Sequence, residues 1–126
     1  MIRSEGRRLV MILHSGDYDR IHHGLSIALA AVANGMSCSI FVAYDAQSRL
    51  TKAQADKIPD DALFKRSLRK LIIEAKQAGS LKLYACGSSL NLMGISREEL
   101  IDEFDGISGL SSFLAENEGS QYSFFI

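Results

Sequence analysis

One cysteine, Cys86, lies where an apolar run gives way to small polar residues, in the stretch "LKLYACGSSLNLMGIS" from Leu81 to Ser96. The apolar run predicts a buried strand, and Gly87, Ser88 and Ser89 predict the start of a helical turn after it. Backbone N–H groups at a helix start lack partners within the helix, and beside a sulfur atom they favour the reactive thiolate. They would also bind an anionic sulfur oxyanion or stabilise a persulfide on Cys86.

A second interpretation of Cys86 needs no chemistry, because a free cysteine is commonly a small buried hydrophobe. If Cys86 is reactive, we expect Gly87 to permit close approach of the backbone and Ser88 and Ser89 to supply N–H or hydroxyl donors. Spacing alone leaves both interpretations open.

A second group of polar residues, "HSGDYD", follows the first apolar run and contains His14, Ser15, Gly16 and Asp17. Ligands of open parallel sheets gather beyond the carboxyl ends of the strands, where "HSGDYD", "AYDA" and "ACGSS" should lie. In a flavodoxin-type strand order the first strand is beside the third, so these residues would border Cys86 and bind substrate or tune the thiol. The alternative is that Asp17 caps a helix and His14 is partly buried.

The other cysteine, Cys38, is a poor partner for Cys86. Cys38 opens its predicted strand whereas Cys86 closes its own, so most of a strand length, at about 3.3 Å per residue, separates them. A disulfide needs Cα atoms within about 7 Å, so we expect no internal bridge. No Cys-x-x-Cys or Cys/His spacing indicates zinc, and the adjacent His22 and His23 do not share a helix face, so we predict no metal site.

The hydrophobic pattern predicts alternating strands and helices. Strands are expected at 7–16, 38–46, 81–87 and 121–126, and helices at 19–35, 59–79, 88–94, 97–104 and 109–119. Asp17 or Asp19 should cap the first helix, Pro59 with Asp60 or Asp61 should open the second, and Ser96 with Glu99 forms a capping box. Residues 47–60 are expected to form a long connection anchored by Leu50 and Ile58.

Strands separated by helices indicate right-handed crossovers and a parallel sheet. We therefore predict one α/β domain over residues 1–126: a flavodoxin-like, doubly wound, mainly parallel sheet of about five strands with helices on both faces. The first helix is apolar around most of its surface, which suggests a subunit interface. The second helix carries a basic outer face, more often a solvated surface than a docking site, formed by Lys65, Arg66, Arg69, Lys70 and Lys76.

Composition excludes several classes of function. The formal net charge of −1 gives no overall attraction to nucleic acid or an anionic membrane. No apolar run approaches the roughly 20 residues that span a bilayer, and "MIRSEGRRLV" lacks a signal-peptide core, so we expect a cytoplasmic protein. Neither G-x-G-x-x-G nor G-x-x-x-x-G-K-[ST] is present, and no cofactor is expected.

Two blocks of sequence resemble a known family. "SGDYDRIHHGLSIALAAVANGMSCSIFVAYDA" and "LKLYACGSSLNLMGISREELID" resemble blocks of the DsrE/DsrF-like family, in particular the branch labelled DsrE-like sulfur-relay protein or predicted peroxiredoxin. The second block is specific, because the cysteine, Met93-Gly94-Ile95 and an acidic segment occur together at the family's spacing. The ending "GLSSFLAENEGSQYSFFI" also resembles the family, whereas "DGISGL" departs from its usual fourth strand and predicts a short or irregular one.

The resemblance implies a flavodoxin-like fold, a homo-oligomer, and a cysteine at position 86 that carries sulfur as a persulfide between donor and acceptor proteins or small thiols. Our leading hypothesis is therefore a sulfurtransferase or sulfur carrier that acts through Cys86. Two alternatives stay open. One is a thiol redox enzyme or sensor, and the other is a non-enzymatic assembly module in which Cys86 is merely packed.

Overall fold

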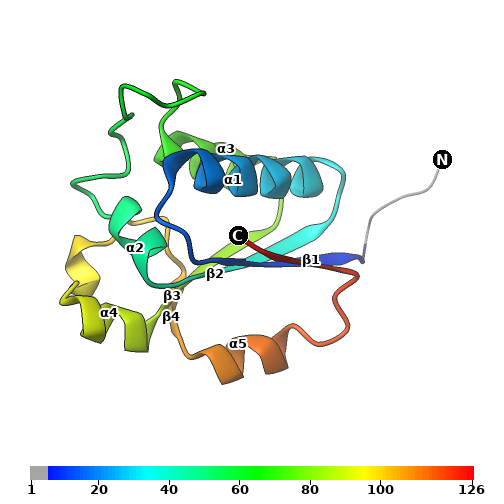
Figure 1. Ribbon diagram of the computed structural model, residues 1–126. Helices are drawn as coiled ribbons and strands as arrows, with labels where there is room; N and C mark the ends of the chain where they lie inside the picture. The colour runs from blue at the N-terminus through cyan, green and yellow to red at the C-terminus, as the bar shows by residue number, and fades with distance from the viewer. Residues whose placement is uncertain (1–5) are drawn as a thin grey trace.

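The computed structural model describes residues 6–126, which form a sheet with helices packed against it (Figure 1). The elements in chain order are β1 (Arg8–Leu13), α1 (Tyr18–Ala33), β2 (Ser37–Val42), α2 (Asp45–Arg49), α3 (Leu68–Ala78), β3 (Leu81–Cys86), α4 (Gly87–Met93), the 3-10 turn η1 (Arg97–Glu99), β4 (Gly106–Ser108), α5 (Leu110–Glu116) and β5 (Tyr122–Phe125).

All five strands are parallel, in the order β4-β3-β2-β1-β5. The predicted fold class, an α/β protein with a parallel sheet and helices on both faces, is confirmed. The expectation that the first strand lies beside the third is wrong, because β2 separates them and β5 takes the other side of β1. The chain steps from β1 through β4 in one direction and then returns to the far side of β1.

One face of the sheet is covered by α1 and α3, which lie side by side in Figure 1. Successive strand residues point to opposite faces, so alternate residues of each strand enter the core beneath these helices. Those on the central strands are fully or almost fully buried: Leu9, Met11, Leu13, Cys38, Ile40, Val42, Leu81 and Leu83. Apolar residues on one face of each helix meet them, and those of α1 are Ile21, Leu25, Ala28 and Val32.

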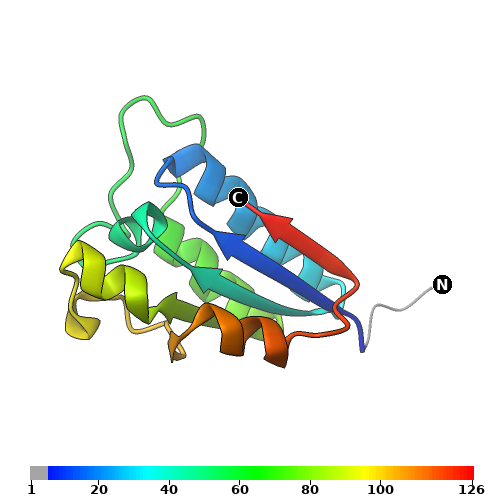
Figure 2. The same ribbon diagram turned by 60° about the horizontal axis from the view of Figure 1, so that its bottom comes forward.

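The opposite face has a thinner cover, with only the short helices α4 and α5 on that side in Figure 1. Phe113 of α5 is fully buried against Val10, Phe41 and Cys86. In Figure 2, β1 and β5 lie unobscured by α5, and Phe125 of β5 is 72% exposed. Parallel sheets are usually buried on both faces, so this face is unusually open near β1 and β5.

The first helix begins and ends as predicted. The Asp17 carboxylate accepts the Arg20 N–H at 3.0 Å and caps α1. Gly35 follows the C-terminal cap with a φ of 87°, a conformation that glycine adopts without a steric penalty.

The connection after β2 is more structured than predicted. β2 ends at Val42, not Ala46, because Tyr44 has a φ of 50° and turns the chain into α2. Leu50 is fully buried and anchors the segment as expected. Ile58 is 37% exposed, so it is not an anchor, and the buried Ala55 takes that role.

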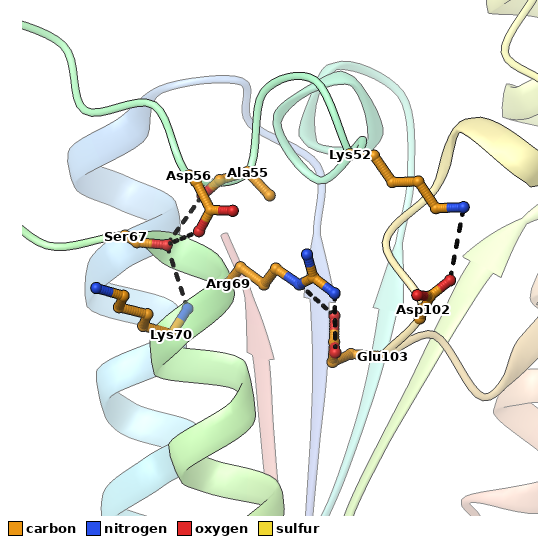
Figure 3. Close-up of polar contacts among 8 residues, drawn as sticks. All are labelled: Lys52, Ala55, Asp56, Ser67, Arg69, Lys70, Asp102 and Glu103. Carbon is orange, nitrogen blue, oxygen red and sulfur yellow. Dashed lines mark hydrogen bonds and ion pairs between the residues drawn. The ribbon is translucent and has the colours of Figure 1, made fainter.

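Helix α3 begins at Leu68, later than the predicted start near Pro59. Ser67 caps it: the hydroxyl oxygen accepts the Lys70 N–H at 3.3 Å, and the hydroxyl donates to Asp56 at 2.6 Å (Figure 3). Gly79 ends the helix as predicted. Phe64 precedes the helix and is 56% exposed.

The predicted basic face is partly neutralised. Arg69 donates from Nε to Glu103 at 2.8 Å, as Figure 3 shows, and Lys76 donates to Asp105 at 2.7 Å. Lys65 and Arg66 lie before the helix and not on it. This surface is therefore less basic than its sequence indicates.

The predicted helix at 97–104 is only the turn η1. Glu99 accepts from the N–H and hydroxyl of Ser96, so the capping box is present. The chain then leaves helical geometry because Leu100 pairs with Thr51 and the Ile101 N–H donates to Leu50 O. β4 has three residues, as the unusual "DGISGL" segment predicts.

No helix within residues 6–126 is long and apolar enough to cross a membrane. The expectation drawn from "MIRSEGRRLV" rests partly on residues 1–5, which lie outside the described residues.

Candidate functional site

Cys86 is the last residue of β3 and the residue that caps α4. The Ser89 N–H donates to its sulfur at 3.5 Å. Its side chain lies on the α5 face of the sheet and is 8% exposed, so the sulfur is enclosed but within reach of a small molecule. The predicted strand-to-helix junction at this cysteine is confirmed.

Cys86 lines a pocket of about 300 Å³. The other residues that line it are Ile12, His14, Phe41, Ala43, Tyr44, Ser88, Leu110 and Phe125. Five of these are apolar, and three, His14, Tyr44 and Ser88, carry polar groups. None of the lining side chains is an acid, a lysine or an arginine, so the pocket is an apolar cavity with a few polar groups around a thiol, as small-ligand sites commonly are.

His14 directly follows β1 and lines this pocket, beside the last residues of β5. The His14 N–H donates to Ile126 O at 2.7 Å, which continues the pairing beyond the strand ends. The imidazole ring is then 4.8 Å from the Tyr44 ring and 5.7 Å from the Phe125 ring, measured between centroids. His14 and Cys86 thus share a pocket although β2 lies between their strands.

Tyr44, Leu110 and Phe125 also line the pocket and are absent from the sequence prediction. Tyr44 lies in "AYDA", at the carboxyl end of a strand, so its place on the functional edge could have been inferred. Leu110 and Phe125 belong to α5 and β5, and their positions depend on β5 returning to β1.

Three of the other predicted residues have clear structural roles. Asp17 caps α1, and Ser15 Oγ accepts the Asp17 N–H at 3.1 Å. Gly16 lies so close to α2 that an added Cβ would be 2.8 Å from the Cβ of Asp45, and its carbonyl accepts from Arg49 Nε at 2.8 Å. Ser15 lines a neighbouring hollow, not the Cys86 pocket.

Gly87 and Ser89 follow Cys86 in the first turn of α4. An added Cβ at Gly87 would be 3.2 Å from the Ile107 side chain, so the glycine allows β4 to lie close to the start of α4. Ser89 is 1% exposed, and its hydroxyl has no hydrogen-bond partner in the part of the chain described. Their roles in binding a substrate stay predictions.

Gln47 is a supporting residue that sequence reasoning missed. It is fully buried, and its Nε2 donates to Val42 O at 3.0 Å and to Cys86 O at 2.9 Å. One side chain of α2 therefore joins the ends of β2 and β3 at the base of the site. A polar residue in a predicted loop gave no signal of this burial.

Cys38 lies in a different environment from Cys86. It lies at the other end of the sheet, opposite Leu81, and is packed beneath α1 and α3. Burial raises the pKa of the Cys38 thiol to about 12. Both cysteines are free thiols, and their separation agrees with the prediction of no internal disulfide.

Within residues 6–126, no group of three or more His, Cys, Asp or Glu side chains is arranged to hold a metal ion. His22 is buried and stacks on Phe64 with 4.7 Å between ring centroids, while His23 is exposed. The two adjacent histidines thus lie in different environments, as their helix spacing predicts.

A model of the DsrE/DsrF-like family matches residues 8–118, so the chain belongs to that family. The uncharacterized protein YrkE of Bacillus subtilis (strain 168) is 25% identical over 156 aligned positions, which cover 95% of this chain and 97% of YrkE.

Solved structures with a similar fold include the ychN protein from E. coli, with a TM-score of 0.74 and 17% identity over 95% of this chain and 99% of ychN. MTH1491 from Methanobacterium thermoautotrophicum, a protein of unknown function, has a TM-score of 0.68 and 14% identity over 94% of this chain and 96% of its own. At these identities the two structures support the fold alone.

Proposed function

We propose that this chain is a sulfur-relay protein that carries sulfane sulfur as a persulfide on Cys86. The family suggests sulfur relay in general terms. The observation that supports Cys86 as the carrier is its position: the sulfur lies at the carboxyl edge of the sheet, on the wall of a small pocket, with a backbone N–H directed at it.

The proposed cycle has two exchanges without net oxidation. The Cys86 thiolate attacks the outer sulfur of a donor persulfide, R–S–SH, and forms a bond to it. The S–S bond of the donor breaks, and its electron pair leaves with the donor thiolate, R–S⁻. A second thiolate then attacks the outer sulfur of the Cys86 persulfide and restores the Cys86 thiolate.

Residues of the pocket suit these steps. The His14 imidazole lines the pocket and can accept a proton from an entering thiol and return it to a leaving one, as histidine side chains do in general acid–base catalysis. The apolar walls from Ile12, Phe41 and Phe125 limit the access of water to the persulfide. The Ser89 N–H can donate to the sulfur that bears the charge.

The donor and acceptor are proteins with reactive thiols or small thiols, and the chain acts as a sulfurtransferase or sulfur carrier in a homo-oligomer. The open sheet face near β5 supports self-association, since it exposes Phe125 of β5. Leu114 of α5 is also half exposed. Neither nucleic acid nor a membrane is part of this proposal.

Cyanide-labile sulfur tests the proposal. The reduced protein is loaded with polysulfide, freed of small molecules and treated with cyanide, and the thiocyanate released is measured. We expect about one sulfur per chain for the unaltered protein and for Cys38→Ser, and none for Cys86→Ser. Equal amounts of cyanide-labile sulfur in Cys86→Ser and in the unaltered protein would refute the proposal.

A further inference from the structure

Tyr44, which follows β2 after one residue, has an unusual backbone conformation. Its φ is 50° and its ψ is −128°, and among residues 6–126 no other residue except glycine has a positive φ. These angles are close to those of the first central position of a type II′ turn, which glycine dominates because it has no Cβ. A tyrosine at this position therefore strains the backbone.

Tyr44 is also the residue that caps α2, and it caps the helix poorly. Its side chain makes no capping hydrogen bond. Serine, threonine, aspartate or asparagine would accept one from the first turn. The position thus has two local costs that a smaller or more polar residue would avoid. Costs of this kind cluster at functional sites, which points to a role for the tyrosine ring itself.

The strained turn changes the side of the sheet on which the ring lies. Ile40 and Val42 of β2 pack beneath α1 and α3, whereas Ala43 belongs to the opposite face with Cys86. Strand alternation continued by one residue would direct Tyr44 beneath α1 and α3. Its positive φ breaks the alternation, and Tyr44 instead lines the Cys86 pocket together with Ala43.

In this pocket the Tyr44 ring contacts the imidazole of His14. The ring centroids are 4.8 Å apart, and the ring planes are inclined by 51°. His14 is exposed, and its hydrogen bond to Ile126 O involves only the backbone N–H. An exposed side chain can occupy several rotamers, so contacts with neighbouring rings limit those of His14. Phe125 contacts the imidazole at 5.7 Å but is itself 72% exposed, which leaves Tyr44 as the closer neighbour.

We propose that Tyr44 is a positioning residue whose ring holds the His14 imidazole in the Cys86 pocket, where His14 takes the proton of an entering thiol. This inference rests on the proposed function and adds a residue to that site. The strained backbone is what brings the ring to the imidazole.

The step that depends on this placement is balanced. The entering thiol, R–SH, gives its proton to His14, and the thiolate attacks the outer sulfur of the Cys86 persulfide. The bond between the two sulfurs of that persulfide breaks, and its electron pair stays on the Cys86 sulfur. The proton held by His14 then returns to this sulfur. The products are R–S–SH and the Cys86 thiol, so no oxidant or reductant is consumed.

Four variants test the inference in the full chain. Tyr44→Ala removes the ring and keeps a Cβ, Tyr44→Gly removes both the ring and the strain, and Tyr44→Phe keeps the ring without its hydroxyl. Tyr122→Ala is the matched control, because Tyr122 is as exposed as Tyr44, at 45%, and does not line the pocket.

Each protein is loaded with polysulfide, freed of small molecules and treated with 2-mercaptoethanol or with sulfite. Intact mass spectrometry measures the rate at which the added sulfur is lost. In mildly alkaline buffer 2-mercaptoethanol is mostly the protonated thiol, whereas sulfite is mostly ionised and has no proton to give up. Only the reaction with the thiol should therefore depend on the position of His14.

We expect Tyr44→Ala and Tyr44→Gly to lose sulfur to 2-mercaptoethanol about tenfold more slowly than the unaltered protein, because a displaced catalytic group can cost this much or more. Their rates with sulfite should change little. Tyr44→Phe should keep the thiol rate, and Tyr122→Ala should change neither rate. In urea titrations Tyr44→Gly should unfold at a higher midpoint than Tyr44→Ala, the reverse of the usual order of glycine and alanine.

Unchanged thiol rates in Tyr44→Ala and Tyr44→Gly would overturn the inference. Equal slowing with sulfite would also overturn it, because general damage to the pocket slows both nucleophiles. A Tyr44→Phe protein as slow as Tyr44→Ala, or a lower urea midpoint for Tyr44→Gly, would contradict the roles given to the ring and to the strain. All these outcomes leave sulfur transport by Cys86 intact. If Cys86 of the unaltered protein takes up no sulfur, the proposed function fails as well, so the two failures are distinguishable.

Discussion

At the scale of single residues, the two cysteines show how position decides chemistry. Cys86 ends a strand and lies on a pocket wall, while Cys38 begins a strand and is 1% exposed in the core. Only a thiolate is a nucleophile, and burial raises the pKa of Cys38 to about 12, so Cys38 is protonated at neutral pH. The pocket therefore contains the Cys86 sulfur, and Cys38 lies outside it.

Alkylation should distinguish the two thiols. In the native protein at pH 8, we expect iodoacetamide to modify Cys86 well before Cys38, whose modification should require unfolding. The measurement is peptide mass spectrometry over a time course, with a sample in denaturant as the control. Equal native rates for the two cysteines would contradict the assignment of Cys38 to a sealed core.

Some site residues could be predicted from the sequence because their position follows from strand ends. His14, Ser88 and Cys86 each follow or close an apolar run, and all three line one pocket. Gln47 could not be predicted, because its burial depends on how α2 folds back over the ends of β2 and β3. Asp17 caps α1, and its position before a predicted helix allows this role as the alternative to substrate binding.

At the scale of elements, Gln47 of α2 joins the ends of β2 and β3 through two hydrogen bonds. Gln47→Leu removes the donor from two buried carbonyl oxygens, and we expect it to lower the free energy of unfolding by about 1–3 kcal/mol. Gln54→Leu, at an exposed position of the same connection, is the matched control. Urea titration measures both, and equal midpoints would show that Gln47 does not join these strand ends.

The segment before α3 packs on α1 through His22 and Phe64. Burial, followed by the nearby Arg66 charge, lowers the pKa of His22, while Asp19 raises it and His23 lowers it by smaller amounts. A lowered pKa means that the folded protein favours the neutral imidazole. As the pH falls through the ordinary histidine pKa, near 6.5, the unfolded chain binds the proton first, so the free energy of unfolding decreases.

His22→Gln should therefore lessen the loss of stability between pH 7 and pH 5. Urea titrations at both pH values measure this change, and His23→Gln, at the exposed neighbouring histidine, should leave the loss as it is. An undiminished loss of stability in His22→Gln would show that this histidine is not the group responsible.

Long periodic elements could be predicted, whereas starts and ends that depend on tertiary contacts could not. Helix α1 follows from its own apolar spacing and from Asp17. The start of α3 depends on Ser67 contacting Asp56, and η1 ends because Leu100 pairs with Thr51. Neither contact is local in sequence, so no periodic pattern predicts it.

At the scale of the whole molecule, the strand order sets both the site and the open face. Because β5 returns beside β1, His14 contacts Phe125, and α5, which precedes β5, lies across the second face. The order of strands could not be predicted, since hydrophobic patterns do not say which strands are neighbours. The parallel arrangement of the strands could be predicted, because each crossover contains helical segments.

The open face should mediate self-association. We expect Leu114→Glu, which places a charge on the exposed side of α5, to shift the protein to smaller species in size-exclusion chromatography with light scattering. Leu63→Glu, on the distant connection before α3, is the matched control and should not change the mass. A monomeric unaltered protein at micromolar concentration would contradict this expectation.

The most direct test of the central claim is to locate sulfur on the chain. The reduced protein is loaded with polysulfide, digested under conditions that preserve persulfides, and analysed by peptide mass spectrometry before and after a second thiol is added. We predict one added sulfur on the peptide that contains Cys86, none on that of Cys38, and its removal by the second thiol. A Cys86 peptide that gains no sulfur while free thiols in the same solution do would contradict the account.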